Sequence, residues 1–340
     1  MDIPNLVRSV AHRPPGEEIR LPDEGPLASF AGATGWLNSE PLTPEGLRGR
    51  VVLVDFWTYT CVNWLRTLPY RRAWATKYAA HGLTIVGVHT PEFGFEHDLD
   101  NVVAQSSALR VEYPIAIDND YGVWRAFANH FWPALYLSDA QGRIRYHHYG
   151  EGEYAMSEMA IQQLLIDAGA SGFDPNPVTV ETQGLEVAAD WANLQSPETY
   201  VGYGQATGFV SAGAAVDVPH AYELAPLRLN QWALAGTWTI ARHAGQLNEP
   251  GGRIAFRFHA RDVNLVMGPA SRGTSIPYRV SLDGRPPADA HGSDVDADGR
   301  GTLNEQRTYQ LIRQPDQQQD HLVEVEFLDR GAEAYCFTFG

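Results

Sequence analysis

The sequence is poor in cysteine, in lysine and in long apolar runs. Its 340 residues include two cysteines, Cys61 and Cys336, which excludes a disulfide framework, an iron–sulfur cluster and a cysteine-rich zinc site. Lys77 is its one lysine, so Schiff-base catalysis has a single candidate and no supporting pattern. No signal peptide is recognisable, and the apolar runs are far shorter than the ~20 residues of a membrane helix. We therefore expect a cytoplasmic protein, or a periplasmic or otherwise extracytoplasmic one if the chain is a fragment of a longer protein.

Positive charge is scarce as well. The chain has 25 Lys and Arg against 41 Asp and Glu, a net charge of −16. Nucleic acids and anionic membranes are bound by clustered Lys and Arg, so neither is an expected partner. Hydrophobic residues make up 44% and charged residues 19%, which is typical of a folded chain. At roughly 100–200 residues per domain, this length predicts two domains.

The pattern of predicted elements changes along the chain. Residues 1–26 are rich in Pro, Gly and Glu and predict a flexible lead-in. Residues 27–170 alternate buried strands with helices, which predicts an α/β domain with a mixed sheet covered on both sides. We expect strands at 50–57, 83–89, 134–138 and 143–149, helices at 61–80, 96–109, 120–130 and 154–168, and a linker at 169–179.

Residues 171–340 have the period of strands instead. Ile254, Phe256 and Phe258 alternate with polar residues, and similar alternation recurs at 263–267, 280–282, 323–327 and 335–339. Turn signals at 251–252, 283–284 and 330–331 separate these runs. Short alternating strands with such punctuation predict an all-β sandwich. Cys336 lies within one of these strands. It could in principle resolve Cys61 from the other domain, but its place among alternating apolar residues favours a packed structural cysteine.

The most informative segment is the one in which a buried strand turns into a helix at Cys61. A helix start favours negative charge, so a cysteine there is expected to have a lowered pKa and to act as a thiolate nucleophile. Asp55 lies inside the apolar strand and is expected to be a buried acid that moves protons for a neighbouring sulfur. Pro69 follows eight residues after Cys61 and should kink the helix.

This segment resembles the thioredoxin superfamily, in the register of its Val-Asp-Phe-Trp strand, its cysteine and its helix proline. Stretches 36–42, 87–93 and 337–340 are similar to proteins that join a TlpA-like (AhpC/TSA) redoxin domain to a carbohydrate-binding-module-like jelly roll. The resemblance implies that Cys61 is the nucleophile, Asp55 the buried acid and Pro133 a cis-proline that contacts the substrate. The second family cysteine is replaced by Trp64.

Three functional hypotheses remain open. The first is a thiol oxidoreductase with a single active cysteine, whose mixed disulfide is resolved by an external thiol. The second is a one-cysteine peroxidase, because Thr58 and Cys61 form a Thr-x-x-Cys motif; Arg66 and Arg125 are its candidate activating arginines. The third is a non-catalytic binding protein whose sandwich recognises glycan or protein. The predicted partners are a thiol or disulfide substrate and an external reductant, and no cofactor is required.

Further residues are candidates for the site and for ligand binding. Those expected to line a substrate pocket near Cys61 are Thr58, Tyr59, Trp64, Trp132 and Glu92. A calcium loop is the hypothesis for Asp294, Asp296, Asp298 and Glu305, which fit the D-x-D-x-D-G-x5-E spacing, although a β-hairpin turn is favoured there. The resemblance also suggests a sugar-stacking platform, whose candidate residues are Trp191, Tyr200, Tyr203, Tyr222 and Trp232.

Overall fold

A computed structural model describes residues 20–315 and 319–340, which form two compact units. The described part of the first unit consists of residues 20–57, 70–90 and 111–180, and that of the second consists of residues 58–69, 91–110, 181–315 and 319–340. The units therefore do not coincide with the expected domains at 27–170 and 171–340, because two segments of the redoxin-like part pack with the C-terminal part. Most of the expected lead-in at 1–26 lies outside the described residues.

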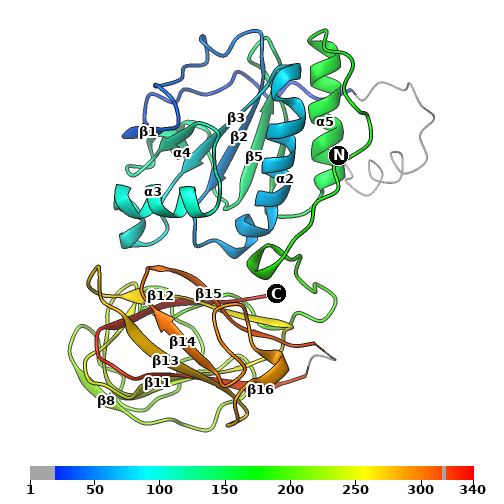
Figure 1. Ribbon diagram of the computed structural model, residues 1–340. Coiled ribbons are helices and arrows are strands. Elements are labelled where there is room, and N and C mark those ends of the chain that lie inside the picture. Colours follow the sequence, from blue (N-terminus) through cyan, green and yellow to red (C-terminus); the bar gives the residue numbers. More distant parts are fainter. Residues whose placement is uncertain (1–19, 316–318) are drawn as a thin grey trace. The chain divides into compact units, whose positions relative to one another are not determined.

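The first unit contains a six-stranded mixed sheet with the order β1-β4-β3-β2-β5-β6 (Figure 1). The β2–β3 and β3–β4 pairs are parallel, and the other pairs are antiparallel. Strand β2 is buried along its whole length, as its apolar sequence predicts. The strands are β1 (Gly35–Leu37), β2 (Val51–Trp57), β3 (Leu83–His89), β4 (Ile115–Ile117), β5 (Ala134–Ser138) and β6 (Ile144–Tyr149).

The helices follow the predicted order but are shorter than expected at several ends. They are α2 (Val62–Tyr78), α3 (Leu99–Ala108), α4 (Gly122–Ala126) and α5 (Tyr154–Asp167), with 3₁₀ turns η1 (Ala79–His81) and η2 (Gly94–His97). Helix α2 contains Pro69 in its interior and crosses from the second unit into the first. Helix α3 starts at Leu99 because the Asp98 side chain caps it by accepting a hydrogen bond from Asp100 N.

The second unit contains an antiparallel sheet of eleven strands that folds into a sandwich. One end of β9 pairs with β11 and the other with β8 and β10, so β9 belongs to both layers. Gly236 lies between these two ends of β9 with φ of 91°, a conformation that favours glycine. The strands are β7 (Thr199–Tyr200), β8 (His220–Tyr222), β9 (Trp232–Ile240), β10 (Gly245–Leu247), β11 (Gly252–Phe258), β12 (Asp262–Pro269), β13 (Ile276–Leu282), β14 (Arg300–Leu303), β15 (Arg307–Arg313), β16 (His321–Phe327) and β17 (Ala332–Phe339), with 3₁₀ turns η3 (Gly184–Glu186) and η4 (Ala288–Ala290).

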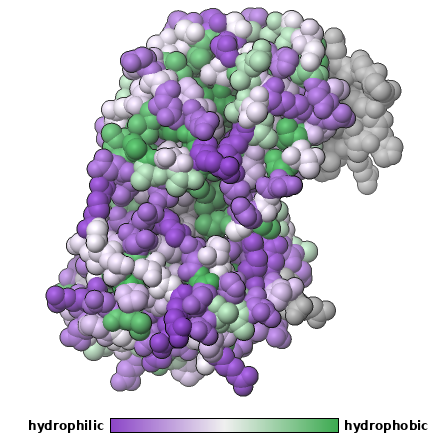
Figure 2. All heavy atoms as spheres, viewed as in Figure 1, coloured by the Kyte–Doolittle hydropathy of each residue, from purple (hydrophilic) through white to green (hydrophobic). Residues whose placement is uncertain are grey.

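The core of the sandwich is made by the alternating apolar residues that the sequence predicts. Ile254, Phe256 and Phe258 of β11 are fully buried there, as are Phe337 and, nearly so, Phe339 of β17. The face of the molecule in Figure 2 is mostly hydrophilic, with smaller hydrophobic areas between the polar residues, as suits a strongly acidic chain. Among the residues described, no helix combines the length and apolarity needed to cross a membrane.

Candidate functional site

Cys61 lies directly before helix α2, at the strand-to-helix turn where the sequence predicts it. Its N–H donates to Thr58 O at 3.2 Å, and its carbonyl accepts the hydrogen bond of Leu65 N at 3.0 Å. Cys61 is therefore the residue that begins the hydrogen bonding of α2. The residue is partly exposed and its thiol is free.

The expected lowering of the Cys61 pKa is wrong. Burial raises the pKa of this thiol well above its usual value, and the charges of Glu92 and Glu198 raise it further. Backbone N–H groups of Asn63 and Trp64 lower the pKa, as a helix start should, but they are the smaller effect. At neutral pH Cys61 is therefore a protonated thiol.

Glu92, which the sequence analysis expects to line a pocket near Cys61, acts on this thiol through its charge. It follows β3 and accepts a hydrogen bond from the Tyr200 hydroxyl. Burial, together with the charges of Glu198 and Glu96, raises the pKa of Glu92 to about 8. Glu198 is a site residue that the sequence does not reveal, because it lies on the approach to β7, far along the chain.

A second buried carboxyl group, Glu96, holds the turn before Cys61. The Thr60 hydroxyl donates to Glu96 Oε1 at 2.6 Å. The other oxygen, Oε2, accepts hydrogen bonds from Glu92 N at 2.7 Å and Phe93 N at 2.9 Å. Burial raises the pKa of Glu96 despite these bonds. Thr58 lies fully buried at this turn, whereas the sequence analysis expects it to line a substrate pocket.

Two of the predicted pocket aromatics are core residues. Trp64 has no exposed surface, and Tyr59 is almost fully buried with its ring 6.1 Å from that of Phe95. Neither ring offers a free face to a ligand from solvent. The expectation that Trp64 and Tyr59 line a substrate pocket open to solvent is therefore wrong for this structure.

Asp55 is buried in the first unit, as expected, but it has a cationic partner. Arg71 Nε lies 2.9 Å from Asp55 Oδ1, and both side chains are almost completely buried. Arg71 comes from α2, which the sequence pattern does not single out. The Asp55 carboxylate is thus committed to a buried ion pair, unlike the isolated acid that the sequence suggests.

The peptide bond between Trp132 and Pro133 is cis, as the resemblance implies. The Trp132 indole N–H donates to Thr90 O at 3.1 Å. Its ring centroid lies 4.2 Å from that of Trp124, and the residue is partly exposed. Trp132 is therefore fixed in the first unit by a hydrogen bond and a ring contact.

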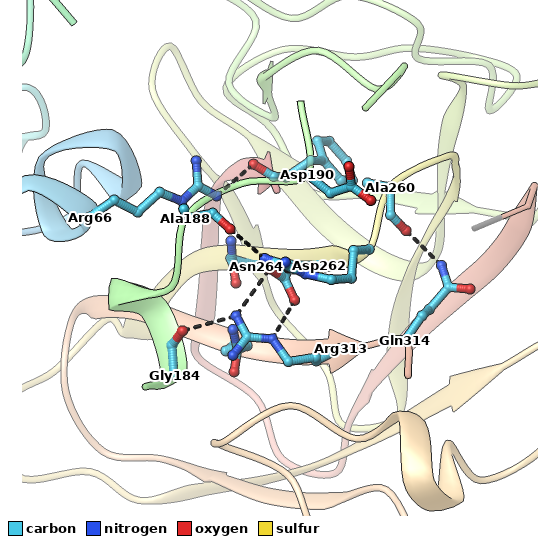
Figure 3. A network of polar contacts seen from close by, with 12 residues as sticks. Arg66, Gly184, Ala188, Asp190, Ala260, Asp262, Asn264, Arg313 and Gln314 are labelled. Carbon is cyan, nitrogen blue, oxygen red and sulfur yellow. Dashed lines mark hydrogen bonds and ion pairs between the residues drawn. The ribbon is translucent and has the colours of Figure 1, made fainter. Parts of the chain in front are cut away.

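Arg66 is not available as an activating arginine. It is buried, and its Nη2 donates to Phe339 O at 2.9 Å. Nearby, Arg313 binds the buried carboxylate of Asp262 at 2.7 Å (Figure 3). Arg261 binds the same carboxylate at 2.6 Å. These cations hold the C-terminal strands of the second unit. The other candidate, Arg125, is at the end of α4 in the first unit.

The calcium-loop hypothesis is not supported. The described residues contain no group of three or more His, Cys, Asp or Glu side chains that could hold a metal ion. Arg307 binds Asp294 at 2.7 Å, and Arg300 binds Asp298 at 2.9 Å. Asp296 accepts a hydrogen bond from the backbone N–H of Arg300, and Glu305 accepts one from the side chain of Gln105. The spacing fits a calcium loop, but the segment connects strands and lacks the flanking helices.

The proposed sugar-stacking platform does not form. Tyr222 and Trp232 are buried in the sandwich core. Tyr200 is partly buried and binds Glu92. Trp191 and Tyr203 are 60% and 40% exposed, but they are only two of the five candidate residues for the platform. Single aromatic residues in a sandwich are more often core than ligand contacts, and that holds here.

Comparison with known proteins finds similarity to thioredoxin-like proteins in both parts of the chain. Residues 196–340 match the family described as "Thioredoxin like C-terminal domain". The chain is 37% identical over 266 residues to Protein DipZ of Mycobacterium tuberculosis, a match that covers 77% of this chain and 37% of that protein. It thus spans little more than a third of the length of this relative.

Shorter relatives match the redoxin-like part. The thiol-disulfide oxidoreductase YkuV of Bacillus subtilis is 28% identical over 144 residues, which cover 42% of this chain and 95% of YkuV. Among solved structures, a thioredoxin-like protein in its oxidised form is 28% identical, with a TM-score of 0.39 over 42% of this chain and 96% of that one.

Proposed function

We propose that this chain is a thiol–disulfide oxidoreductase. Its residues 196–340 match the thioredoxin-like C-terminal domain family, and it is similar over most of its length to Protein DipZ. Cys61 is its attacking thiol. The observation that carries this proposal is the position of Cys61, a free and partly exposed cysteine at the start of the helix that follows the central strand.

The reaction is an exchange of one disulfide for another. The Cys61 thiolate attacks one sulfur of a substrate disulfide, which forms a mixed disulfide and releases one substrate thiolate. A second thiol then attacks the Cys61 sulfur and releases the other half of the substrate. Trp64 occupies the position of the second family cysteine, so residue 64 cannot supply this second thiol. The sequence analysis expects an external thiol to supply it.

Two observations favour this reaction over the peroxidase alternative. A peroxidase of this type needs a hydroxyl and an arginine that are accessible and can hold the peroxide. Thr58 is fully buried, and Arg66 is buried and binds a backbone carbonyl of β17. We therefore expect hydrogen peroxide to oxidise Cys61 no faster than an unactivated thiol, as trapping of sulfenic acid would show.

The test is catalysis of disulfide reduction by the full chain. Glutathione serves as reductant and bis(2-hydroxyethyl) disulfide as substrate, and consumption of the disulfide is followed. The wild-type chain should accelerate the reaction, and Cys61→Ser should return it to the uncatalysed rate. Equal rates for the two chains at every substrate concentration would overturn the proposal. The exposed residue Ser29 provides a control through Ser29→Ala, which should keep the wild-type rate.

A further inference from the structure

The two cysteines of the chain belong to the same compact unit. Cys61 lies in the segment 58–69 that packs with the sandwich, and Cys336 lies on β17. Cys336 is 1% exposed, and its thiol contacts Phe337 O at 3.4 Å. The strand register shows which way this thiol faces.

Cys336 is part of a row of residues across four strands. It pairs with Tyr200 of β7 on one side and with Val266 of β12 on the other. Val266 pairs in turn with Thr308 of β15. Directly paired residues of antiparallel strands place their side chains on the same face of a sheet. The side chains of Thr308, Val266, Cys336 and Tyr200 therefore share one face.

That face points away from the sandwich core. The neighbours Phe337, Leu265 and Tyr309 belong to the core cluster, and alternate residues of a strand point to opposite faces. None of the four residues in the row belongs to the core cluster. The Cys336 thiol is therefore buried against whatever covers the outer face of β15, β12 and β17.

The segments around Cys61 cover this row at both ends. At one end the Thr308 hydroxyl donates to Thr60 O at 2.7 Å, directly before Cys61. At the other end the Tyr200 hydroxyl donates to Glu92. Cys336 lies between these two anchors, and neighbouring paired residues are only about 5 Å apart. The geometry thus brings Cys336 to the chain segment that carries Cys61.

The charges around the two thiols agree with this placement. Glu198 and Glu92 raise the pKa of both Cys61 and Cys336, after the larger effect of burial. The charge of Cys61 also raises the pKa of Cys336. The two sulfur atoms therefore share one electrostatic environment.

We propose that Cys336 is the second thiol of the reaction, supplied by the sandwich in place of the cysteine that Trp64 replaces. The inference rests on the proposed function of Cys61. Cys61 attacks the substrate disulfide and forms the mixed disulfide, with release of one substrate thiolate. The Cys336 thiolate then attacks the Cys61 sulfur and releases the second substrate thiolate. The protons of the two protein thiols end on the two substrate thiolates. The chain is then oxidised by two electrons to a Cys61–Cys336 disulfide, and the substrate disulfide is reduced to two thiols.

The experiment is a single turnover of the reduced full chain with glutathione disulfide, quenched in acid and analysed by intact-protein and peptide mass spectrometry. The wild-type chain should lose two hydrogens, retain no glutathione and yield a peptide pair joined through Cys61 and Cys336. Cys336→Ala should retain one glutathione on Cys61. Its adduct should last at least about 10-fold longer than that of the wild type, because an intramolecular thiol acts at millimolar or higher effective concentration.

The outcomes separate the two proposals. A wild-type chain that keeps glutathione on Cys61 as long as Cys336→Ala would overturn the role of Cys336 and leave the external thiol as the resolving group. A wild-type chain whose Cys61 does not react while folded, but reacts in urea, would overturn the proposed function itself. Cys336→Ser serves as a second variant, and retention of the wild-type circular dichroism shows that either variant is folded.

Discussion

At Cys61, burial and neighbouring charges raise the pKa of the thiol more than the backbone N–H groups lower it. The N–H groups at the start of α2 favour the thiolate, and this local effect can be predicted from the sequence. Burial and the carboxyl groups of Glu92 and Glu198 act in the opposite direction and are larger. Glu198 cannot be found from the sequence, because only the packing of β7 brings it to the site. The rate of thiol–disulfide exchange at Cys61 should therefore keep rising to higher pH than is typical of thioredoxin-like thiols.

The first prediction concerns Glu92 and the reactivity of Cys61. Glu92 is mostly neutral below its pKa of about 8 and charged above it, so it opposes the thiolate chiefly at alkaline pH. Glu92→Gln should leave alkylation of Cys61 by iodoacetamide nearly unchanged well below pH 8. Above that pH it should raise the rate about 3–10-fold, which corresponds to half to one pKa unit. The control Glu45→Gln, at an exposed turn, should match the wild type, and an unchanged rate in Glu92→Gln at high pH would contradict the prediction.

The second prediction concerns stability against pH. The pKa of Glu92 rises from 4.5 in the unfolded chain to about 8 in the folded one, so the folded state keeps a proton that the unfolded state releases. The stability contributed by this group is complete below about pH 4.5 and is lost as the pH rises through about 8. Urea unfolding of Glu92→Gln should thus show a smaller fall in stability over this range than the wild type. Parallel curves for the two chains would count against a raised pKa.

At the scale of elements, long apolar runs are predicted well and short strands are not. Strands β3 and β5 have the expected bounds, and strand β2 and helices α2 and α5 differ from theirs by at most two residues at either end. Strands β1 and β4 have three residues each and are absent from the prediction, because a strand of that length carries too little pattern.

The partner of Asp55 is missed for a different reason. Arg71 is one of several arginines in α2, and only the packing of α2 on β2 selects it.

The third prediction concerns this contact between β2 and α2. Arg71→Met should leave the Asp55 carboxylate buried without its cation, which costs about 3–5 kcal/mol of unfolding free energy. Chemical denaturation monitored by tryptophan fluorescence measures this loss. Arg143→Met is the matched control, because Arg143 and its partner Asp23 are 44% and 52% exposed, and it should cause no measurable loss. Equal midpoints for the two variants would show that the buried ion pair does not stabilise the fold.

At the scale of the whole molecule, the chain passes repeatedly between its two compact units. Segments 58–69 and 91–110 belong to the second unit although they are flanked by segments of the first. Linker composition at 169–179 predicts a simple boundary there, and the described residues 169–179 indeed contain no helix or strand. Sequence composition cannot show that earlier segments pack with later ones, since that depends on contacts such as Thr60 with Thr308.

The fourth prediction follows from these shared segments. A fragment of residues 181–340 lacks the segments that cover β17, so Cys336, which is 1% exposed in the full chain, should become accessible. Its reaction with a thiol reagent under native conditions should be at least about 10-fold faster than in the Cys61→Ser full chain. Circular dichroism of the fragment identifies whether it keeps its β structure. Equal labelling rates in a folded fragment would mean that other parts of the sandwich bury Cys336.

The order of synthesis gives this chain a particular difficulty. Phe93 and Phe95 leave the ribosome early, but both pack on Tyr335 of β17, close to the last residues of the chain. At about 5–20 residues per second, some 10–50 seconds separate the two events. During that time these two side chains lack their contact with β17. Chaperones that hold nascent aromatic segments should therefore determine how much active protein a cell obtains.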